Sequence, residues 1–168
     1  MDLLIKALEH SDNDRRLKRA ERTVWISQYE IGGVIAGSVE VIHLLQEARN
    51  CFVEAHYIAT LMLATAVIEH LISNKLLQIS KAKYGISFER AIEIAREEKI
   101  FSSDLLDSAD KLRQLRNPFA HLKPGNHEST LANRFVAQKR HPIAVVEDDA
   151  KEAVVAMYGY FDCALISE

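Results

Sequence analysis

Helical periodicity dominates the hydrophobic pattern of this chain. In residues 56–81, apolar side chains recur at intervals of three and four residues and broaden into a stripe that almost encircles a helix. No segment alternates apolar and polar residues for long enough to suggest a sheet. The pattern predicts an all-α fold in which the helix 56–81 is the central element of a bundle.

The same periodicity predicts shorter helices on both sides of this element. Ser38 and Ser87 precede apolar-periodic segments and are predicted N-caps, and Gly85 is predicted to stop the central helix. Residues 141–146, HPIAVV, are predicted to be extended. The remaining predicted helices span residues 12–30, 38–54, 88–98, 103–116, 130–140 and 148–166.

Three glycines separate the first predicted helix from the rest. Gly32, Gly33 and Gly37 lower the cost of non-helical backbone angles, so they predict a flexible hinge. We therefore divide the chain into an N-terminal helical extension with its hinge, residues 1–36, and one helical domain, residues 37–168. The basic residues in the first helix favour a solvated face over a phosphate contact.

Composition supports one domain in a reducing compartment. The chain has 168 residues, of which 48% are hydrophobic, enough for a continuous core. Cys51 and Cys163 lie far apart inside helical patterns and predict no disulfide framework. The N-terminal apolar run is too short for a secretory leader, and residues 57–72 fall short of the ~20 apolar residues of a membrane span. We expect a cytoplasmic protein without a membrane partner.

Net charge gives no general attraction for a polyanion. The formal charge is -3, so binding of nucleic acid would depend on local clusters of lysine and arginine.

One cation interrupts an apolar stripe. On the predicted helix 103–116, Leu105, Ala109 and Leu112 share a face, and the next position of that series is Arg116. An unpaired buried guanidinium is costly, so Arg116 is expected to meet a carboxylate or to line a cleft that an anion can enter.

The residues after Arg116 add a second group that handles phosphates. Pro118 is expected to end the helix at Asn117, which could cap a brief new turn with free backbone N–H groups and His121 beside them. A guanidinium binds two phosphate oxygens, and an imidazole moves protons near neutral pH.

These residues resemble a known family. The run LRQLRNPFAHL, residues 112–122, resembles the Arg-x4-6-His motif of the HEPN superfamily, and residues 47–72 are similar to its paired helices. The resemblance covers about residues 37–166 and implies a four- to five-helix bundle. It also implies a homodimer in which two motifs face one cleft, and in many members metal-independent cleavage of RNA.

Carried over to this chain, the resemblance assigns roles to three residues. His121 would transfer the proton as the ribose 2′-OH attacks, Arg116 would stabilise charge on the phosphorus oxygens, and Asn117 would orient the phosphate or His121. Glu69 shares the inward face of the central helix, and its expected partner is Arg116 or Arg113. A purely structural ion pair is the alternative.

The chain departs from the family at one place. In HEPN toxins neutralised by nucleotidyltransferase antitoxins, a modified tyrosine commonly follows the motif histidine by two residues, and here that residue is Lys123. Regulation by that route is therefore doubtful, although an antitoxin protein remains a candidate partner. The candidate contacts to the RNA backbone are Lys123, Arg134, Lys139, Arg140 and His141.

Other chemistries find less support. Glu40 and His43 have the spacing of a di-iron ligand pair, but no second such pair accompanies them, so we expect neither metal nor cofactor. No serine or cysteine nucleophile motif is present. The leading hypothesis is a HEPN ribonuclease that acts as a toxin or antiviral effector. The alternatives are a non-catalytic HEPN module that binds RNA, a nucleotide or a protein, and a purely structural role for Arg116 and His121.

Overall fold

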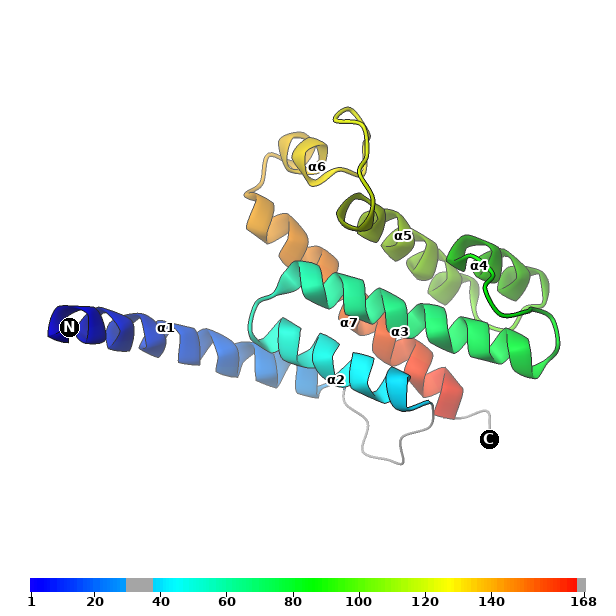
Figure 1. The fold of residues 1–168 in the computed structure, drawn as a ribbon, viewed down its shortest axis with the longest axis horizontal. Coiled ribbons are helices and arrows are strands. Elements are labelled where there is room, and N and C mark those ends of the chain that lie inside the picture. The colour runs from blue at the N-terminus through cyan, green and yellow to red at the C-terminus, as the bar shows by residue number, and fades with distance from the viewer. Residues whose placement is uncertain (30–37, 166–168) are drawn as a thin grey trace.

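The computed structural model describes residues 1–29 and 38–165, and these residues form seven helices with no strand (Figure 1). The all-α prediction is therefore confirmed for this part of the chain. The helices are α1 (Asp2–Ser27), α2 (Val39–Val53), α3 (Tyr57–Gln78), α4 (Phe88–Glu97), α5 (Ser103–Ala120), α6 (Leu131–Gln138) and α7 (Pro142–Leu165).

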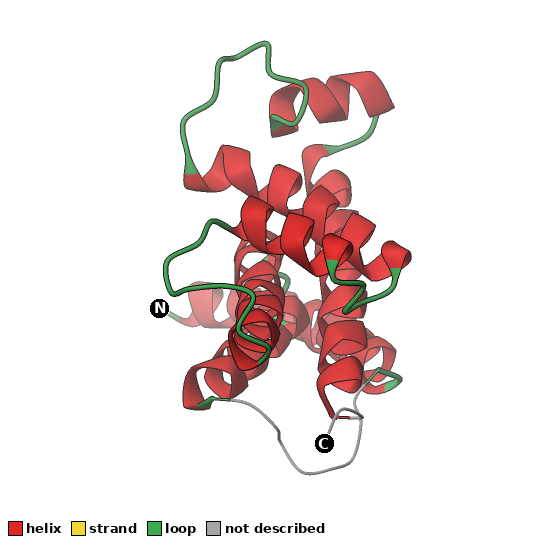
Figure 2. Ribbon diagram, turned by 90° about the vertical axis from the view of Figure 1, so that its right-hand side faces the viewer, coloured by secondary structure: helices red, strands yellow, loops and turns green. Residues whose placement is uncertain are grey.

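Helix α3 occupies the centre of a helical bundle, as the hydrophobic pattern predicted. It packs most extensively on α7 and α2, and it also contacts α4 and α5. Helices α1 and α6 are the outer elements and each has one main neighbour. Helix α6 packs on α7, at one end of the molecule, and α1 packs on α2 (Figure 2). Among the described helices, α3 alone is long and apolar enough to cross a membrane, judged by length and composition only. Half of its most apolar stretch is buried inside the bundle. Its neighbours account for that apolar surface.

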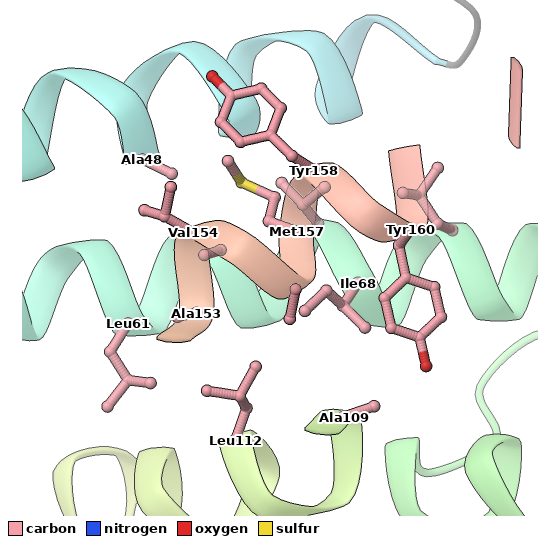
Figure 3. Packing of buried hydrophobic residues seen from close by; sticks show 14 of the residues in the cluster. Ala48, Leu61, Ile68, Ala109, Leu112, Ala153, Val154, Met157, Tyr158 and Tyr160 are labelled. Carbon is pink, nitrogen blue, oxygen red and sulfur yellow. The ribbon is translucent and has the colours of Figure 1, made fainter. Parts of the chain in front are cut away.

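Small side chains let α7 approach α3 and α5 closely. Ala150 and Ala153 of α7 are fully buried, and Figure 3 shows Ala153 in the layer between α3 and α5, which contribute Ile68 and Leu112. At Gly159 of α7, a methyl group would meet Leu105 Cδ2 of α5 at 3.2 Å. Close packing of this kind maximises the dispersion contacts that hold the bundle together.

The predicted N-caps form as expected. The hydroxyl groups of Ser38 and Ser87 accept hydrogen bonds from Val41 N and Arg90 N. Thr130 caps the short helix α6 in the same way. These side chains satisfy N–H groups that have no partner within the helix.

The predicted end of the central helix was wrong. Helix α3 ends at Gln78, and Ser80 adopts a left-handed φ of 57° while Lys81 N bonds back to Leu76 O. Ala55, Lys99 and Lys139 turn the chain in the same way after other helices. Sequence reasoning expects glycine at this position, so it placed the stop at Gly85 instead.

Two predicted helix starts were also wrong. Helix α1 begins at Asp2, ten residues before the predicted start, and its predicted end at Glu30 lies outside the described residues. The expected hinge at Gly32, Gly33 and Gly37 lies there too. The polar residues 11–14 do not interrupt the helix, and the Ser11 hydroxyl bonds back to Leu8 O at 3.0 Å.

Residues 141–146 are helical rather than extended. Helix α7 starts at Pro142, six residues before the predicted start, and its predicted end at Ile166 is not described. His141 Nδ1 accepts a bond from Ile143 N, and proline suits the first helical position. Val145 and Val146 are both buried in the bundle, where packing outweighs the weak helical propensity of β-branched side chains.

The packing around α3 predicts unequal costs for two isoleucines on that helix. Ile68 is fully buried, whereas Ile58, which the sequence placed on the same inward stripe, is 42% exposed. Ile68→Ala should lower the free energy of unfolding by about 2–5 kcal/mol through lost contacts and a cavity. Ile58→Ala should lower it by less than about 1 kcal/mol. Urea denaturation followed by circular dichroism measures both, and equal losses would contradict the packing described here.

Candidate functional site

Arg116 borders the buried face of α5. That face consists of Leu106, Ala109, Leu112 and Leu115, and the Arg116 side chain is 20% exposed. Its Nη1 donates a hydrogen bond to Oε2 of Glu69 on α3, at 3.0 Å. The sequence had offered Arg116 or Arg113 as the partner of Glu69, and the structure selects Arg116.

The ion pair uses only part of the guanidinium. Nε of Arg116 is buried and has no hydrogen-bond partner among the described residues. An unsatisfied buried N–H costs free energy, and a ligand oxygen or a water molecule would relieve that cost. Glu69 itself is 31% exposed, so the pair lies at the edge of the core and not at its centre.

Arg113 has a different environment. Its Nη2 lies 2.8 Å from Asp110 Oδ1 and 3.1 Å from Glu89 Oε1, which joins α5 to α4. A depression of about 440 Å³ beside it is lined by four carboxylates, those of Glu89, Glu93, Glu97 and Asp110, against two guanidinium groups, those of Arg96 and Arg113. The excess of negative charge around Arg113 would repel a phosphate, so Arg113 serves the packing of α4 on α5.

The backbone after Arg116 differs from the predicted break. Helix α5 continues through Pro118 to Ala120, because His121 N bonds to Asn117 O at 2.8 Å and Phe119 packs against the core. No new helix start forms at Asn117, so the expected cluster of free N–H groups is absent from this described segment. Carbonyl groups end the helix here, and their dipole attracts cations rather than phosphates.

Arg116 and His121 share the end of α5 but leave it in different directions. Arg116 lies within α5, whereas the helix ends at Ala120, one residue before His121. His121 has an extended backbone, with φ -139° and ψ 137°, which takes it off the helix. Its side chain is exposed, whereas that of Asn117 is partly buried. The two groups are close along the chain without being parallel.

The predicted cationic contacts fall into two groups. Arg134 forms two hydrogen bonds with Asp149, at 2.7 and 2.5 Å, and both side chains are largely buried. Arg140 pairs with Asp148 at 2.5 Å. Lys123 and Lys139 form no ion pair within residues 1–29 and 38–165. Among these four lysine and arginine side chains, the two lysines therefore keep their charge available to a ligand.

A hollow of about 270 Å³ adjoins the ion pair. Glu69, Ser73 and Asn74 of α3 line one side, and the connection to α4, including Lys83 and Tyr84, lines the other. Sequence reasoning missed this hollow, although Glu69 and Ser73 are four residues apart and so share a helix face. His70 also lines it.

The described residues offer no metal centre. No group of three or more histidine, cysteine, aspartate or glutamate side chains among them could hold an ion. Burial raises the pKa of the Cys51 thiol, which disfavours the reactive thiolate. Burial likewise raises the pKa of Asp162 on α7, whose Oδ1 has no hydrogen-bond partner in the described part of the chain.

No protein-family model, curated protein or solved structure matches this chain. A proposal for the function of this chain is therefore supported by the geometry of the site and by the motif in the sequence.

The ion pair between Arg116 and Glu69 predicts a stability difference between two glutamate variants. Glu69→Ala leaves a partly buried guanidinium without its acceptor and should lower the free energy of unfolding by about 1–3 kcal/mol. Glu152→Ala removes a more exposed pair with Lys111 and should change it little. Urea denaturation at pH 7 compares them, and a neutral Glu69→Ala would show that the pair does not hold α5 on α3.

The buried pair of Arg134 and Asp149 predicts a structural role for Arg134. Asp149→Ala leaves an uncompensated buried cation and should cost about 3–5 kcal/mol, whereas Arg134→Met with Asp149→Leu should recover most of that loss. Thermal and urea unfolding measure both variants. If the double variant were as unstable as the single one, the charge pair would not be the source of the loss.

Proposed function

We propose that this chain is a metal-independent endoribonuclease of the HEPN type, in which Arg116 and His121 act on one phosphodiester of RNA. One observation carries the proposal. The guanidinium of Arg116 is fixed at the edge of the core by Glu69, and the His121 side chain is exposed at the end of the same helix. A positioned cation and an exposed imidazole at the end of one helix are the minimum equipment for this reaction.

The proposed reaction is an internal transfer at phosphorus. The ribose 2′-oxygen forms a bond to phosphorus while the bond from phosphorus to the 5′-oxygen breaks. A base takes the 2′-OH proton, and an acid gives a proton to the departing 5′-oxygen. The products are a 2′,3′-cyclic phosphate and a 5′-OH. The need for a 2′-OH confines the reaction to RNA.

Glu69 has a positioning role in this proposal. Its carboxylate holds Nη1 of Arg116, so the guanidinium does not have to be ordered when the phosphate binds. Nε, which has no partner in the described residues, is available to a phosphate oxygen after a small shift of the side chain. Asn117 lies between the two main groups in sequence and would help to orient the phosphate or His121.

The directions of the two side chains favour the participation of a second copy. Arg116 is held against Glu69 of α3 within the helix, whereas His121 follows the helix with an extended backbone and is exposed. The reaction also needs both a base and an acid, and one chain supplies one motif histidine. Two copies with their α5 ends facing each other would supply both groups, and Lys123 would contact the RNA backbone. A toxin or antiviral effector in a cytoplasm, with an antitoxin protein as a further partner, is the biological setting we propose.

A non-catalytic module that binds RNA, a nucleotide or a protein is the second candidate. Two observations favour it. Glu69 already compensates the charge of Arg116, and the end of α5 presents carbonyl groups instead of N–H groups. In that case the same residues would recognise a ligand without cleaving it.

The test is cleavage of mixed RNA in the presence of EDTA. The wild-type protein should produce fragments with cyclic phosphate ends. His121→Ala should slow cleavage by about 10²- to 10⁴-fold, because general acid–base catalysis contributes that much, and Arg116→Ala should slow it comparably. A substrate with 2′-deoxyribose at the cleaved position should remain intact.

His127→Ala provides the matched control, since His127 is another exposed histidine in the segment after α5. It should cleave RNA at the wild-type rate. Folding of all variants is checked by circular dichroism. Binding of RNA without cleavage, weakened in the Arg116 and His121 variants, would replace the enzymatic proposal with the second candidate. Loss of folding in both variants would favour a structural role.

A further inference from the structure

The N-terminal half of α1 extends beyond the bundle without a partner in the described chain (Figure 1). Helix α1 packs on α2 through its last turns, where Ile26 is fully buried and Trp25 lies 4.9 Å from Phe52 between ring centroids. Along the rest of its surface, α1 exposes large apolar side chains to solvent. They are Met1, Leu3, Leu4, Ile5, Leu8, Leu17 and Val24.

Three of these side chains form a line on the face opposite the bundle. Leu3, Leu17 and Val24 are spaced by multiples of seven residues and are 85%, 64% and 72% exposed. Arg22, which donates to Val53 O at 2.7 Å, lies two residues from Val24 and so points about 160° away from this line. The line is therefore directed away from the protein's own α2.

The charges of α1 are divided between its two halves. The first half contains four carboxylates, those of Asp2, Glu9, Asp12 and Asp14, with Lys6 as its one lysine or arginine. The second half contains five cations, those of Arg15, Arg16, Lys18, Arg19 and Arg22, with Glu21 as its one carboxylate. Arg19 pairs with Glu54 and Arg22 donates to Val53 O, so the cations directed to other molecules are Arg15, Arg16 and Lys18. Two such helices attract each other when they run antiparallel and repel when they run parallel.

We propose that the exposed face of α1 pairs with the same face of a second copy of this chain, antiparallel and around a twofold axis. Placing Leu3 opposite the partner's Val24 also places Ala7 opposite the partner's Ala20, so small residues meet where the helices must approach closely. The twofold axis then passes between Asn13 and Asp14. In this register each acidic half faces a basic half.

The surface around Val24 is shaped for this contact. Ala20, Glu21, Val24, Trp25 and Gln28 line a shallow, mostly apolar depression. Leu3 of the second copy would enter it, and the twofold axis would repeat the contact at the other end. Such an isologous pair closes on itself and leaves no unpaired end.

The charge pattern argues against a membrane surface as the occupant. Helices that lie on anionic membranes carry lysine and arginine along their polar face. In α1 the exposed apolar end coincides with the acidic half, which anionic lipids would repel. A second copy would cover Leu3, Leu17 and Val24 and would bring an acidic half against a basic half.

Cysteine cross-linking tests the pairing and its direction. In a chain with Cys51→Ala and Cys163→Ala, the variants Leu3→Cys and Val24→Cys are oxidised separately and as an equal mixture. Antiparallel pairing should give a cross-linked dimer containing one chain of each kind, because the two sulfur atoms are then opposite each other. Mass spectrometry with one isotopically labelled variant identifies it. Self-cross-linking of Leu3→Cys would indicate parallel pairing and overturn the proposal.

A charge introduced on the line provides the second measurement. Leu17→Glu should halve the mass of the assembly in sedimentation experiments, whereas Val136→Glu, at a 66% exposed valine on α6, should leave it unchanged. A monomeric wild-type chain would overturn the proposal, and so would a monomer that sediments with vesicles containing phosphatidylglycerol. The pairing does not depend on the proposed function, and cleavage of RNA by these variants is measured separately.

Discussion

Covering the apolar surface of α3 is the constraint on which the rest of the structure depends. Its buried residues face more than one side of the helix, so no single neighbour can remove them all from water. Helices α2 and α7 cover most of this surface, and α4 and α5 cover the remainder. The alanines and the glycine of α7 make that coverage close.

The candidate site arises where that coverage is incomplete. Glu69 follows the fully buried Ile68 on α3, at the edge of the contact with α5. A carboxylate there needs a partner, and Arg116 on α5 reaches it. The same ion pair therefore fastens α5 to the central helix and fixes a guanidinium beside solvent. Stability and the proposed chemistry thus depend on one contact, and variants of either residue must be tested for folding as well as for activity.

Intramolecular pairing decides which other cations can serve a ligand. Arg113, Arg134 and Arg140 are all engaged with carboxylates, whereas Lys123 and Lys139 have no ion pair in the described part of the chain. Helix α1 differs from this, because most of its charged and exposed apolar side chains have no partner within the bundle. Residues that a fold leaves unmatched are the ones available for contacts with other molecules.

The sequence by itself determined the helical class, the central position of α3, the caps at Ser38 and Ser87 and the inward direction of Glu69. These follow from periodicity and from hydrogen bonds between residues close in the chain. Only the tertiary structure decided that Glu69 meets Arg116 and not Arg113, that Arg134 is buried against Asp149, and that α5 continues through Pro118. Each of these depends on packing between helices distant in sequence, which outweighs local preferences and which no local pattern encodes.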